Sequence, residues 1–485
     1  MIELKNVDYT YDNAQNGSLY DVSLSVKKGE TVLLCGKSGC GKTTVTRLIN
    51  GLIPHYYEGT LSGTVIVNNV DIAGSELYET ARYVGSVFQN PRSQFFCVDT
   101  TSELAFACEN MGLPEDEIQR RISNSAREME LEHLLGRNIF RLSGGEKQKI
   151  ACASVSAVHP EVIVLDEPTS NLDAASIAML KQIVLRWKSA GKTIVVAEHR
   201  LQWLCGVCDR VVYLDGGRIV FDMPMAEFVR LLPEYLTQLG LRPLHMDAML
   251  PVQPSDIPDE ALELINFRYS HQGKQKDLDI GSLTLPRNSI IAIVGKNGAG
   301  KSTLSHCLCG LTKGFKGKVR MDGALLGKRQ RLKKCYMVMQ DVNHQLFCES
   351  VREEVMLGMN MDNTGDTARI LTQLNLEELT DRHPVSLSGG QKQRTAIAAA
   401  LLADKEILIF DEPTSGLDYL HMQETARLLR SLRGKRTVLV ITHDPELIMS
   451  CCTHVLQMEN GVAEQPYSLD GEGCTRLLGY FNERG

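Results

Sequence analysis

Residues 36–44 read Gly36-Lys37-Ser38-Gly39-Cys40-Gly41-Lys42-Thr43-Thr44 and directly follow the apolar run 31–35. This short run is bounded by glycine, which is typical of a buried strand. The glycines allow backbone N–H groups to surround phosphate oxygens, Lys42 adds a positive charge, and the Thr43 hydroxyl can ligate Mg²⁺. The stretch therefore predicts a P-loop between a buried strand and a helix.

The same motif occurs a second time. It reads Gly295-Lys296-Asn297-Gly298-Ala299-Gly300-Lys301-Ser302-Thr303 and follows the apolar run 290–294. A chance match in a chain of this length has odds of about one in fifty at ordinary residue frequencies, so two copies indicate a duplicated unit. A chain of 485 residues is also too long for one hydrophobic core and suits two domains.

The domain boundaries follow from the segments that flank the repeats. Each half opens with an alternating apolar segment, at 2–7 and at 262–267, which suits a half-exposed antiparallel strand. The region before the second segment contains Pro224, Pro233, Pro243, Pro251, Pro254 and Pro258. We predict a first domain at 1–235, a linker at 236–259 and a second domain at 260–485.

Composition describes a globular protein, with 43% apolar and 23% charged residues. The net charge is −7 and long basic blocks are absent, so nucleic-acid binding is not expected. There is no apolar run of membrane-spanning length and no signal-peptide pattern, and we expect the chain to stay in the cytoplasm. Most of the 14 cysteines lie in apolar runs or helices and are expected to be core residues. Cys205 and Cys208 have metal-like spacing, but they lack a second such pair.

Two further motifs recur downstream. Leu-Ser-Gly-Gly occurs at 142–145 and 387–390, and a Ser-Gly-Gly turn that opens a helix can bind an anion. The apolar runs 162–165 and 407–410 then end in the acid pairs Asp166-Glu167 and Asp411-Glu412. Acids at the carboxyl end of a buried strand face the ligand crevice. We predict that each Asp binds Mg²⁺ and each Glu is a general base, with a structural ion pair as the minor alternative.

Together these motifs resemble those of ATP-binding-cassette (ABC) ATPases over nearly the whole chain. In this resemblance 171–173 and 416–418 are the D-loops, His199 and His443 are the switch histidines, and Gln89 and Gln340 are the Q-loop glutamines that sense the γ-phosphate and Mg²⁺. The resemblance implies an α/β fold with two P-loop NTPase (ABC ATPase) domains fused head-to-tail. Each domain would have a RecA-like parallel-sheet core, an antiparallel β subdomain and an α-helical subdomain.

The resemblance also implies two composite ATP sites within one chain, each joining one P-loop to the signature turn of the other half. Both sites should hydrolyse ATP with Mg²⁺. The catalytic residues implied are Glu167, Glu412, His199 and His443. The metal-binding residues implied are Thr43, Gln89, Asp166, Ser302, Gln340 and Asp411. The nucleotide would contact both P-loops, both Q-loop glutamines and the turns Ser143, Gly144, Gly145 and Ser388, Gly389, Gly390. Tyr11 and Tyr269 either stack on adenine or are partly buried strand tyrosines.

The segments after the Q-loop glutamines indicate a subfamily. Residues 89–96 and 340–347 each carry a second glutamine, Gln94 or Gln345, followed by two apolar side chains. With residues 103–110 they resemble the ATPases of energy-coupling-factor (ECF) importers of vitamins or transition-metal ions, although residues 353–360 keep only the outline. This implies integral membrane partners, namely a coupling subunit and a substrate-binding subunit, and a peripheral location on the cytoplasmic face of the membrane. Twin-cassette ATPases of the ribosome and of sugar or peptide importers are the alternatives.

Two expectations concern packing. Residues 115–135 carry an amphipathic helical pattern that should pack against its own domain. The pairs Phe95-Phe96 and Leu346-Phe347 should line an apolar groove for a coupling helix of a membrane subunit, or else belong to the core.

Overall fold

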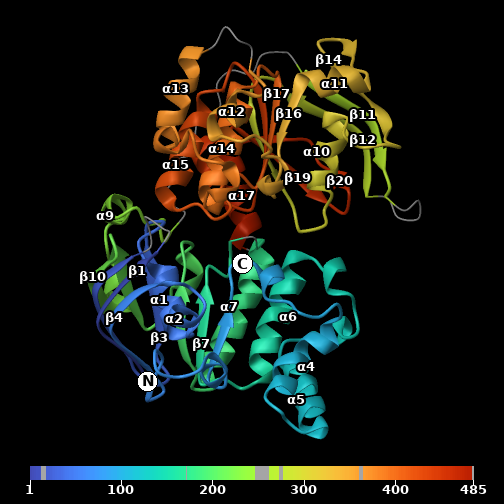
Figure 1. Cartoon of the computed structure of the whole chain (residues 1–485). Coiled ribbons are helices and arrows are strands. Elements are labelled where there is room, and N and C mark those ends of the chain that lie inside the picture. The colour runs from blue at the N-terminus through green and yellow to red at the C-terminus, as the bar shows by residue number, and fades with distance from the viewer. Residues whose placement is uncertain (13–17, 171, 246–260, 272–276, 360–363, 483–485) are drawn as a thin grey trace. The chain divides into compact units, whose positions relative to one another are not determined.

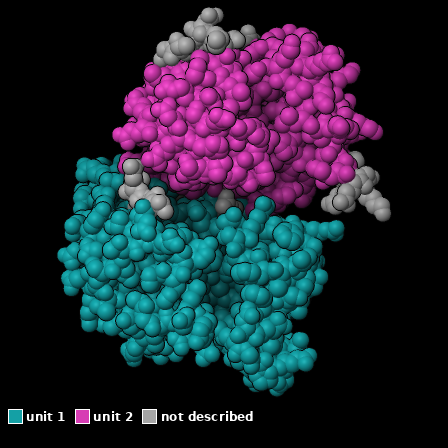
Figure 2. Space-filling view, in the orientation of Figure 1, with its two compact units in different colours: residues 1–245 teal, residues 246–485 magenta. Residues whose placement is uncertain are grey.

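The computed structural model describes residues 1–12, 18–170, 172–245, 261–271, 277–359 and 364–482. The chain divides into two compact units, residues 1–245 and 246–485 (Figure 2). Each unit contains an antiparallel sheet, a mostly parallel sheet and a group of helices (Figure 1). This arrangement confirms the predicted α/β fold class with its antiparallel and helical parts.

The antiparallel sheet of the first unit has the order β2-β1-β4-β5. Its strands are β1 (Ile2–Tyr11), β2 (Leu19–Val26), β4 (Gly59–Val67) and β5 (Val70–Asp71). The larger sheet has the order β10-β9-β3-β8-β7-β6, and all neighbours are parallel except β10 and β9. Its strands are β3 (Thr31–Gly36), β6 (Val84–Val87), β7 (Val162–Asp166), β8 (Thr193–Ala197), β9 (Arg210–Asp215) and β10 (Arg218–Pro224).

The first unit contains helices of several lengths. They are α1 (Lys42–Ile49), α2 (Leu52–His55), α3 (Leu77–Thr80), α4 (Thr100–Asn110), α5 (Glu115–Glu128), α6 (Gly144–Ala157), α7 (Ala174–Ser189), α8 (Met225–Phe228) and α9 (Pro233–Gln238). The apolar side of α5, with Ile118, Ile122 and Ala126, is buried in a core that α4 and α6 share. The amphipathic segment therefore packs against its own domain, as expected.

The second unit repeats this plan. Its antiparallel sheet has the order β12-β11-β14-β15, and the larger sheet has the order β16-β17-β18-β13-β19-β20, with β21 beside β19. The strands are β11 (Ala261–Tyr269), β12 (Leu278–Pro286), β13 (Ile290–Val294), β14 (Lys316–Met321), β15 (Ala324–Leu325), β16 (Cys335–Val338), β17 (Ile407–Asp411), β18 (Thr437–Ile441), β19 (His454–Glu459), β20 (Val462–Ala463) and β21 (Tyr467–Ser468). The helices are α10 (Lys301–Cys309), α11 (Lys328–Lys334), α12 (Val351–Met356), α13 (Thr364–Gln373), α14 (Gly389–Leu402), α15 (Tyr419–Arg430), α16 (Pro445–Cys451) and α17 (Gly471–Asn482).

The period of two along the central strands divides each unit into two cores. In β3, Val32 and Leu34 pack with α1 and the antiparallel sheet, whereas Leu33 and Cys35 pack with the helical part. The second unit divides in the same way along β13. Burial on both faces explains why these strands are apolar without alternation.

The first unit continues beyond the predicted boundary at residue 235. Leu236 in α9, and then Leu241 and Leu244, are buried in its core, so residues 236–245 of the predicted linker pack within this unit. The remainder of the predicted linker, 246–259, lies outside the described residues. Among the described helices, none is both long and apolar enough to cross a membrane.

Candidate functional site

The first P-loop leaves β3 at Gly36 and enters α1 at Lys42. Gly41, the residue before the helix, has φ 103°, and a Cβ at Gly36 would lie 2.1 Å from the Leu214 carbonyl oxygen. Both positions therefore require glycine. The Lys42 ammonium is buried and donates to the carbonyl oxygens of Gly36 and Lys37, each at 3.0 Å. The lysine thus holds its charge at the centre of the loop.

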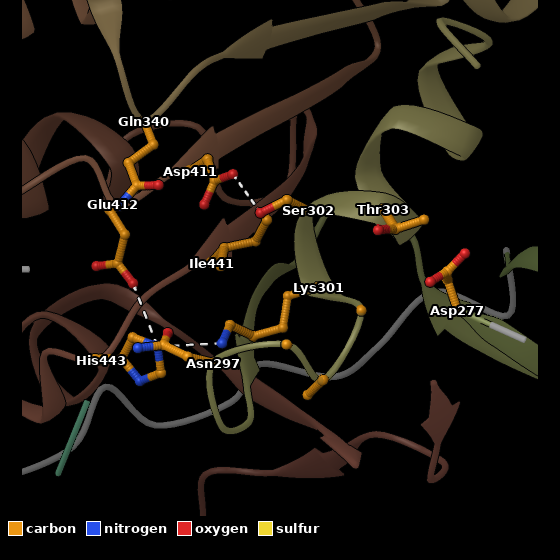
Figure 3. A pocket seen from close by; sticks show the side chains of 13 residues that line it. Asp277, Asn297, Lys301, Ser302, Thr303, Gln340, Asp411, Glu412, Ile441 and His443 are labelled. Carbon is orange, nitrogen blue, oxygen red and sulfur yellow. Dashed lines mark hydrogen bonds and ion pairs between the residues drawn. The ribbon is translucent and has the colours of Figure 1, made fainter. Parts of the chain in front are cut away.

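The second P-loop has the same construction. Gly300 has φ 96° at the start of α10, and Lys301 Nζ donates to the carbonyl oxygens of Gly295 at 2.7 Å and Lys296 at 3.1 Å. A cavity of about 280 Å³ opens beside this loop (Figure 3). Its lining includes the P-loop residues 297–303, Gln340, both acids of the pair 411–412 and His443. The structure therefore brings together these predicted residues of the second half.

Each acid pair lies at the end of its strand, against the hydroxyl that follows the P-loop lysine. Thr43 Oγ1 donates to Asp166 Oδ1 at 3.1 Å, and Ser302 Oγ donates to Asp411 Oδ2 at 2.7 Å. Burial, and after it the neighbouring Glu167 charge, raise the pKa of Asp166 to about 7. Burial also raises the pKa of Asp411. A nearby cation would favour the charged carboxylate in both units.

These donors fit Mg²⁺. Each half offers one hydroxyl and one carboxylate in contact, and oxygen ligands of this hard type are those that the ion prefers. The amide of Gln340 lines the cavity of the second half, and the amide of Gln89 donates to the neighbouring Glu167 in the first. The described part of the chain has no group of three or more His, Cys, Asp and Glu side chains arranged to hold a metal. A sparse protein ligand set is typical of Mg²⁺, which keeps waters and takes substrate phosphates as further ligands.

The second acid of each pair has a left-handed backbone, with φ 46° at Glu167 and 51° at Glu412. Such values are uncommon for glutamate and often mark functional sites. In the first unit Glu167 Oε1 lies 3.2 Å from His199 Nε2, and Glu167 Oε2 accepts from Gln89 Nε2 at 2.7 Å. The predicted base of this half, Glu167, therefore contacts both the switch histidine and the Q-loop glutamine.

The corresponding contacts of the second unit differ. His443 Nε2 lies 3.8 Å from Glu412 Oε1 and 3.1 Å from Lys301 Nζ (Figure 3). Gln340 lines the same cavity, and Thr442 Oγ1 lies 3.5 Å from Glu412 Oε2. The strand-end histidine of this half thus connects the P-loop lysine with the acid.

The two signature turns are helix starts, as the sequence predicted. Ser143 caps α6, since Glu146 N donates to its hydroxyl at 3.3 Å and Ser143 N donates to Glu146 Oε2 at 2.8 Å. Ser388 and Gln391 form the same capping box at α14. Ser143 and Ser388 are exposed, as are Gly144 and Gly389, whereas Gly145 is buried and Gly390 partly buried. Exposed helix N-termini can accept an anion from outside the unit.

The two candidate adenine-stacking tyrosines lie in different surroundings. The Tyr11 hydroxyl is 3.2 Å from Thr44 Oγ1 and accepts from Arg47 Nη1 at 3.0 Å, beside the P-loop helix. The Tyr269 ring packs edge-on against His271, with centroids 4.8 Å apart. Both rings are partly buried against their own sheet cores, so adenine stacking stays a prediction.

The segments after the Q-loop glutamines are held by contacts that the sequence analysis did not assign. Gln94 Oε1 accepts from Phe88 N at 3.3 Å, and Gln345 Oε1 accepts from Met339 N at 3.0 Å. Glu103 Oε2 accepts from the backbone N–H groups of Phe96 and Cys97, at 3.0 and 2.8 Å. Glu354 does the same for residues 347 and 348, at 2.7 and 2.8 Å. The equal spacing of the two glutamates after the Q-loops is the signal that could have revealed them.

With these hydrogen bonds in place, the first apolar side chain of each pair points toward the core and the second points toward solvent. Phe95 packs against the core of the first unit, whereas Phe96 is 74% exposed with its ring stacked on Phe106 at 4.9 Å. Leu346 packs against the core of the second unit, and Phe347 is 76% exposed. The alternative was that Phe95, Phe96, Leu346 and Phe347 are all core residues. It is wrong for Phe96 and Phe347.

The fold and the site define a class of protein: a P-loop nucleoside triphosphatase that carries one phosphate loop, acid pair and strand-end histidine in each half. The sequence profile of the ABC transporter family matches residues 19–170 and 278–415. An ABC transporter ATP-binding protein of Treponema denticola is 44% identical over 471 residues, covering 95% of this chain and 96% of the relative. A relative of Sulfurisphaera tokodaii with the same description is 32% identical over 474 residues, covering 95% and 96%.

Solved structures agree on the fold. RNase-L Inhibitor superposes with a TM-score of 0.66 at 22% identity, covering 98% of this chain and 92% of that chain. ABCE1 in a ribosome-bound archaeal complex with Pelota gives 0.71 at 23% identity, covering 98% and 80%. The protein belongs to the ABC transporter family, as a tandem ABC ATPase that binds ATP with Mg²⁺ and hydrolyses it.

Proposed function

We propose that this protein is the ATPase subunit of a membrane importer of the energy-coupling-factor type, which takes up a vitamin or a metal ion. The observation that carries the proposal is the pair of exposed phenylalanines, Phe96 and Phe347, each directly after a Q-loop and each tied by a buried glutamate. Large exposed aromatic side chains favour a protein partner. Membrane coupling and substrate-binding subunits would supply that partner on the cytoplasmic face of the membrane.

Each site would work through its own residues. Lys42 and Lys301 would bind the β- and γ-phosphates, and the Thr43–Asp166 and Ser302–Asp411 pairs would hold Mg²⁺, which neutralises phosphate charge when bound. Glu167 and Glu412 would take the proton from the attacking water. His199 and His443 would orient these glutamates, and Gln89 and Gln340 would report γ-phosphate occupancy to the segments that follow.

The two ATP sites would be completed by the signature turn of the other half. The P-loop, the acid pair and the Q-loop glutamine contribute to the lining of the cavity of the second unit, and among the described residues, 388–390 are not part of it. Exposed helix starts at Ser143 and Ser388 are suited to receive a γ-phosphate from the opposite P-loop. Both composite sites would then form within one chain and close on ATP.

The exposed phenylalanines provide the test. Replacing both, as Phe96→Asp and Phe347→Asp, should abolish copurification of membrane subunits with the tagged chain while its ATPase activity in solution stays within about twofold, because neither ring belongs to the site. Tyr78→Asp is the matched control, since Tyr78 is 63% exposed and lies in α3. Retention of the membrane subunits by the double variant would overturn the proposal. Copurification with ribosomal subunits instead would favour a twin-cassette ATPase of the ribosome, whose fold this chain shares.

A further inference from the structure

The cavity of the second unit has one acidic residue that belongs to none of the family motifs. Asp277 lies directly before β12 and lines the cavity together with P-loop residues. Figure 3 shows Gln340 and Glu412 at one end, and Thr303 and Asp277 at the opposite end. The cavity therefore has acidic groups at both ends, with Lys301 and Ser302 between them.

The direction of a bound nucleotide follows from this arrangement. Phosphates bind at the P-loop, and the γ-phosphate lies nearest to the acid that activates water, Glu412. A nucleoside triphosphate is extended, so its sugar leaves the loop at the Thr303 end, where Asp277 lies. A carboxylate would repel phosphate at that place, but it is a strong acceptor for a sugar hydroxyl.

Asp277 is held firmly in place. Its backbone N–H donates to the Tyr269 carbonyl at 3.0 Å, and a Cβ at Gly300 would lie 2.9 Å from its carbonyl oxygen, so the main chain abuts the last P-loop glycine. Its Oδ2 accepts from His271 N at 2.5 Å and lies 3.1 Å from His271 Nδ1. A carboxylate offers about four acceptor positions on two oxygens, so the contacts with His271 orient the group and leave Oδ1 for a ligand.

We propose that Asp277 is a specificity-determining residue that accepts a hydrogen bond from a ribose hydroxyl, so that the second P-loop prefers ribonucleotides to deoxyribonucleotides. The inference rests on the proposed function of this cavity as a nucleotide site. Ser18 occupies the matching place before β2 in the first unit, where it is buried. A neutral hydroxyl is a weaker acceptor than a carboxylate, so the first P-loop should discriminate less.

The test measures binding to the full chain by calorimetry, with Lys42→Ala present so that the second P-loop is observed. ATP, 2′-deoxy-ATP and 3′-deoxy-ATP are compared with Mg²⁺. Loss of the contacted hydroxyl should weaken binding about tenfold, because the acceptor is charged. In Asp277→Ser this difference should fall to about twofold or less, since the two changes remove the same contact. Asp277→Asn keeps an acceptor oxygen and should retain part of the discrimination.

The reciprocal variant, Ser18→Asp with Lys301→Ala, should raise the discrimination at the first P-loop. If Asp277→Ser weakens ATP and both deoxynucleotides equally, while thermal unfolding is unchanged, the acid does not contact ribose and the proposal is overturned. If ATP still binds after both P-loop lysines are replaced by alanine, the assignment of the cavity itself is wrong, which is a separate result from any change at Asp277.

Discussion

The two halves gather the same residue types around their P-loops but connect them differently. In the first unit Glu167 contacts both Gln89 and His199, at 2.7 and 3.2 Å. In the second unit His443 lies closer to Lys301 than to Glu412, at 3.1 against 3.8 Å. The motifs therefore determine which groups meet at the strand ends, whereas the pairing among them depends on the surroundings of each half.

The comparison also extends to the side chains around the motifs. The P-loops differ at three positions, one of which is Cys40 in the first and Ala299 in the second. The residue before the second strand of each antiparallel sheet is Ser18 in the first unit and Asp277 in the second. Duplicated sites that share their reactive groups can thus differ in how they hold the nucleotide. The following experiments ask how far the two sites are equivalent.

The largest effect is expected from the glutamates that follow the strand-end aspartates. Glu167→Gln and Glu412→Gln together should lower steady-state ATP hydrolysis by about 100-fold or more, because the general base is lost, while ATP binding persists. The single variants compare the halves directly: equal losses would indicate equivalent sites. Undiminished hydrolysis in the double variant would show that neither glutamate is the base.

The next effect concerns stability. Burial and the Glu167 charge raise the pKa of Asp166 from 3.8 to about 7, so the folded state disfavours its ionisation and loses stability as the pH rises from about 4 to 7. Asp166→Asn removes this loss and, without Mg²⁺, should raise the free energy of unfolding at pH 8 by about 2–4 kcal/mol.

Thermal unfolding with a chelator checks this, at pH 5 and pH 8. The gain should be smaller at pH 5, where the wild-type carboxyl is largely protonated. Asp411→Asn is the matched variant in the second half, and burial raises the pKa of Asp411 too. A gain that is larger at pH 5 than at pH 8 would contradict the ionisation argument.

A third experiment asks which signature serves which P-loop. Lys42→Ala and Ser388→Arg should damage one composite site, so their combined effect on hydrolysis should be non-additive by about 1 kcal/mol or more. Lys42→Ala with Ser143→Arg should instead affect both sites and leave little turnover. The reverse pattern of couplings would mean that each half completes its own site.

The smallest effect should come from Cys40→Ala, which gives the first P-loop the residue found in the second. Cys40 is buried, with its sulfur 3.8 Å from Lys42 Nζ. Loss of this side chain should cost about 1 kcal/mol or less and leave hydrolysis within about twofold, since alanine is accommodated at residue 299. Chemical denaturation and initial rates measure both quantities. A large loss of activity would make the sulfur part of phosphate binding.

Local sequence predicted the parts of the site that are local in the chain. The strand before Gly36, the helix from Lys42 and the helix starts at Ser143 and Ser388 all occur as expected, because glycine geometry and capping boxes act within a few residues. The acid pairs also stand at the ends of their strands.

The motifs predicted that the glutamine, acid and histidine of each half lie at one P-loop, but other contacts between distant side chains were not predicted. The place of Asp277 beside the second P-loop results from how β12 lies against the start of α10, and a lone acid before a strand carries no signal of its own. The proline spacing predicted that the first domain ends at residue 235. In the structure Leu241 and Leu244 are buried in the core of the first unit, so this unit continues beyond the first prolines. The hydrogen bond that Glu103 accepts from the loop before it was likewise not predicted.

The backbone of Glu167 and Glu412, which is left-handed in both, is positioned by the neighbouring strand. Glu167 N donates to the carbonyl of Ala197 at 2.8 Å, and Glu412 N donates to that of Ile441 at 2.9 Å, so the last residue of the adjacent parallel strand fixes each main chain. The alignment of neighbouring strands therefore fixes the position of the glutamate backbone, independently of the side chains that contact its carboxylate. Damage to that alignment, even on the far side of the sheet, should displace the acid more than removal of its glutamine or histidine neighbour.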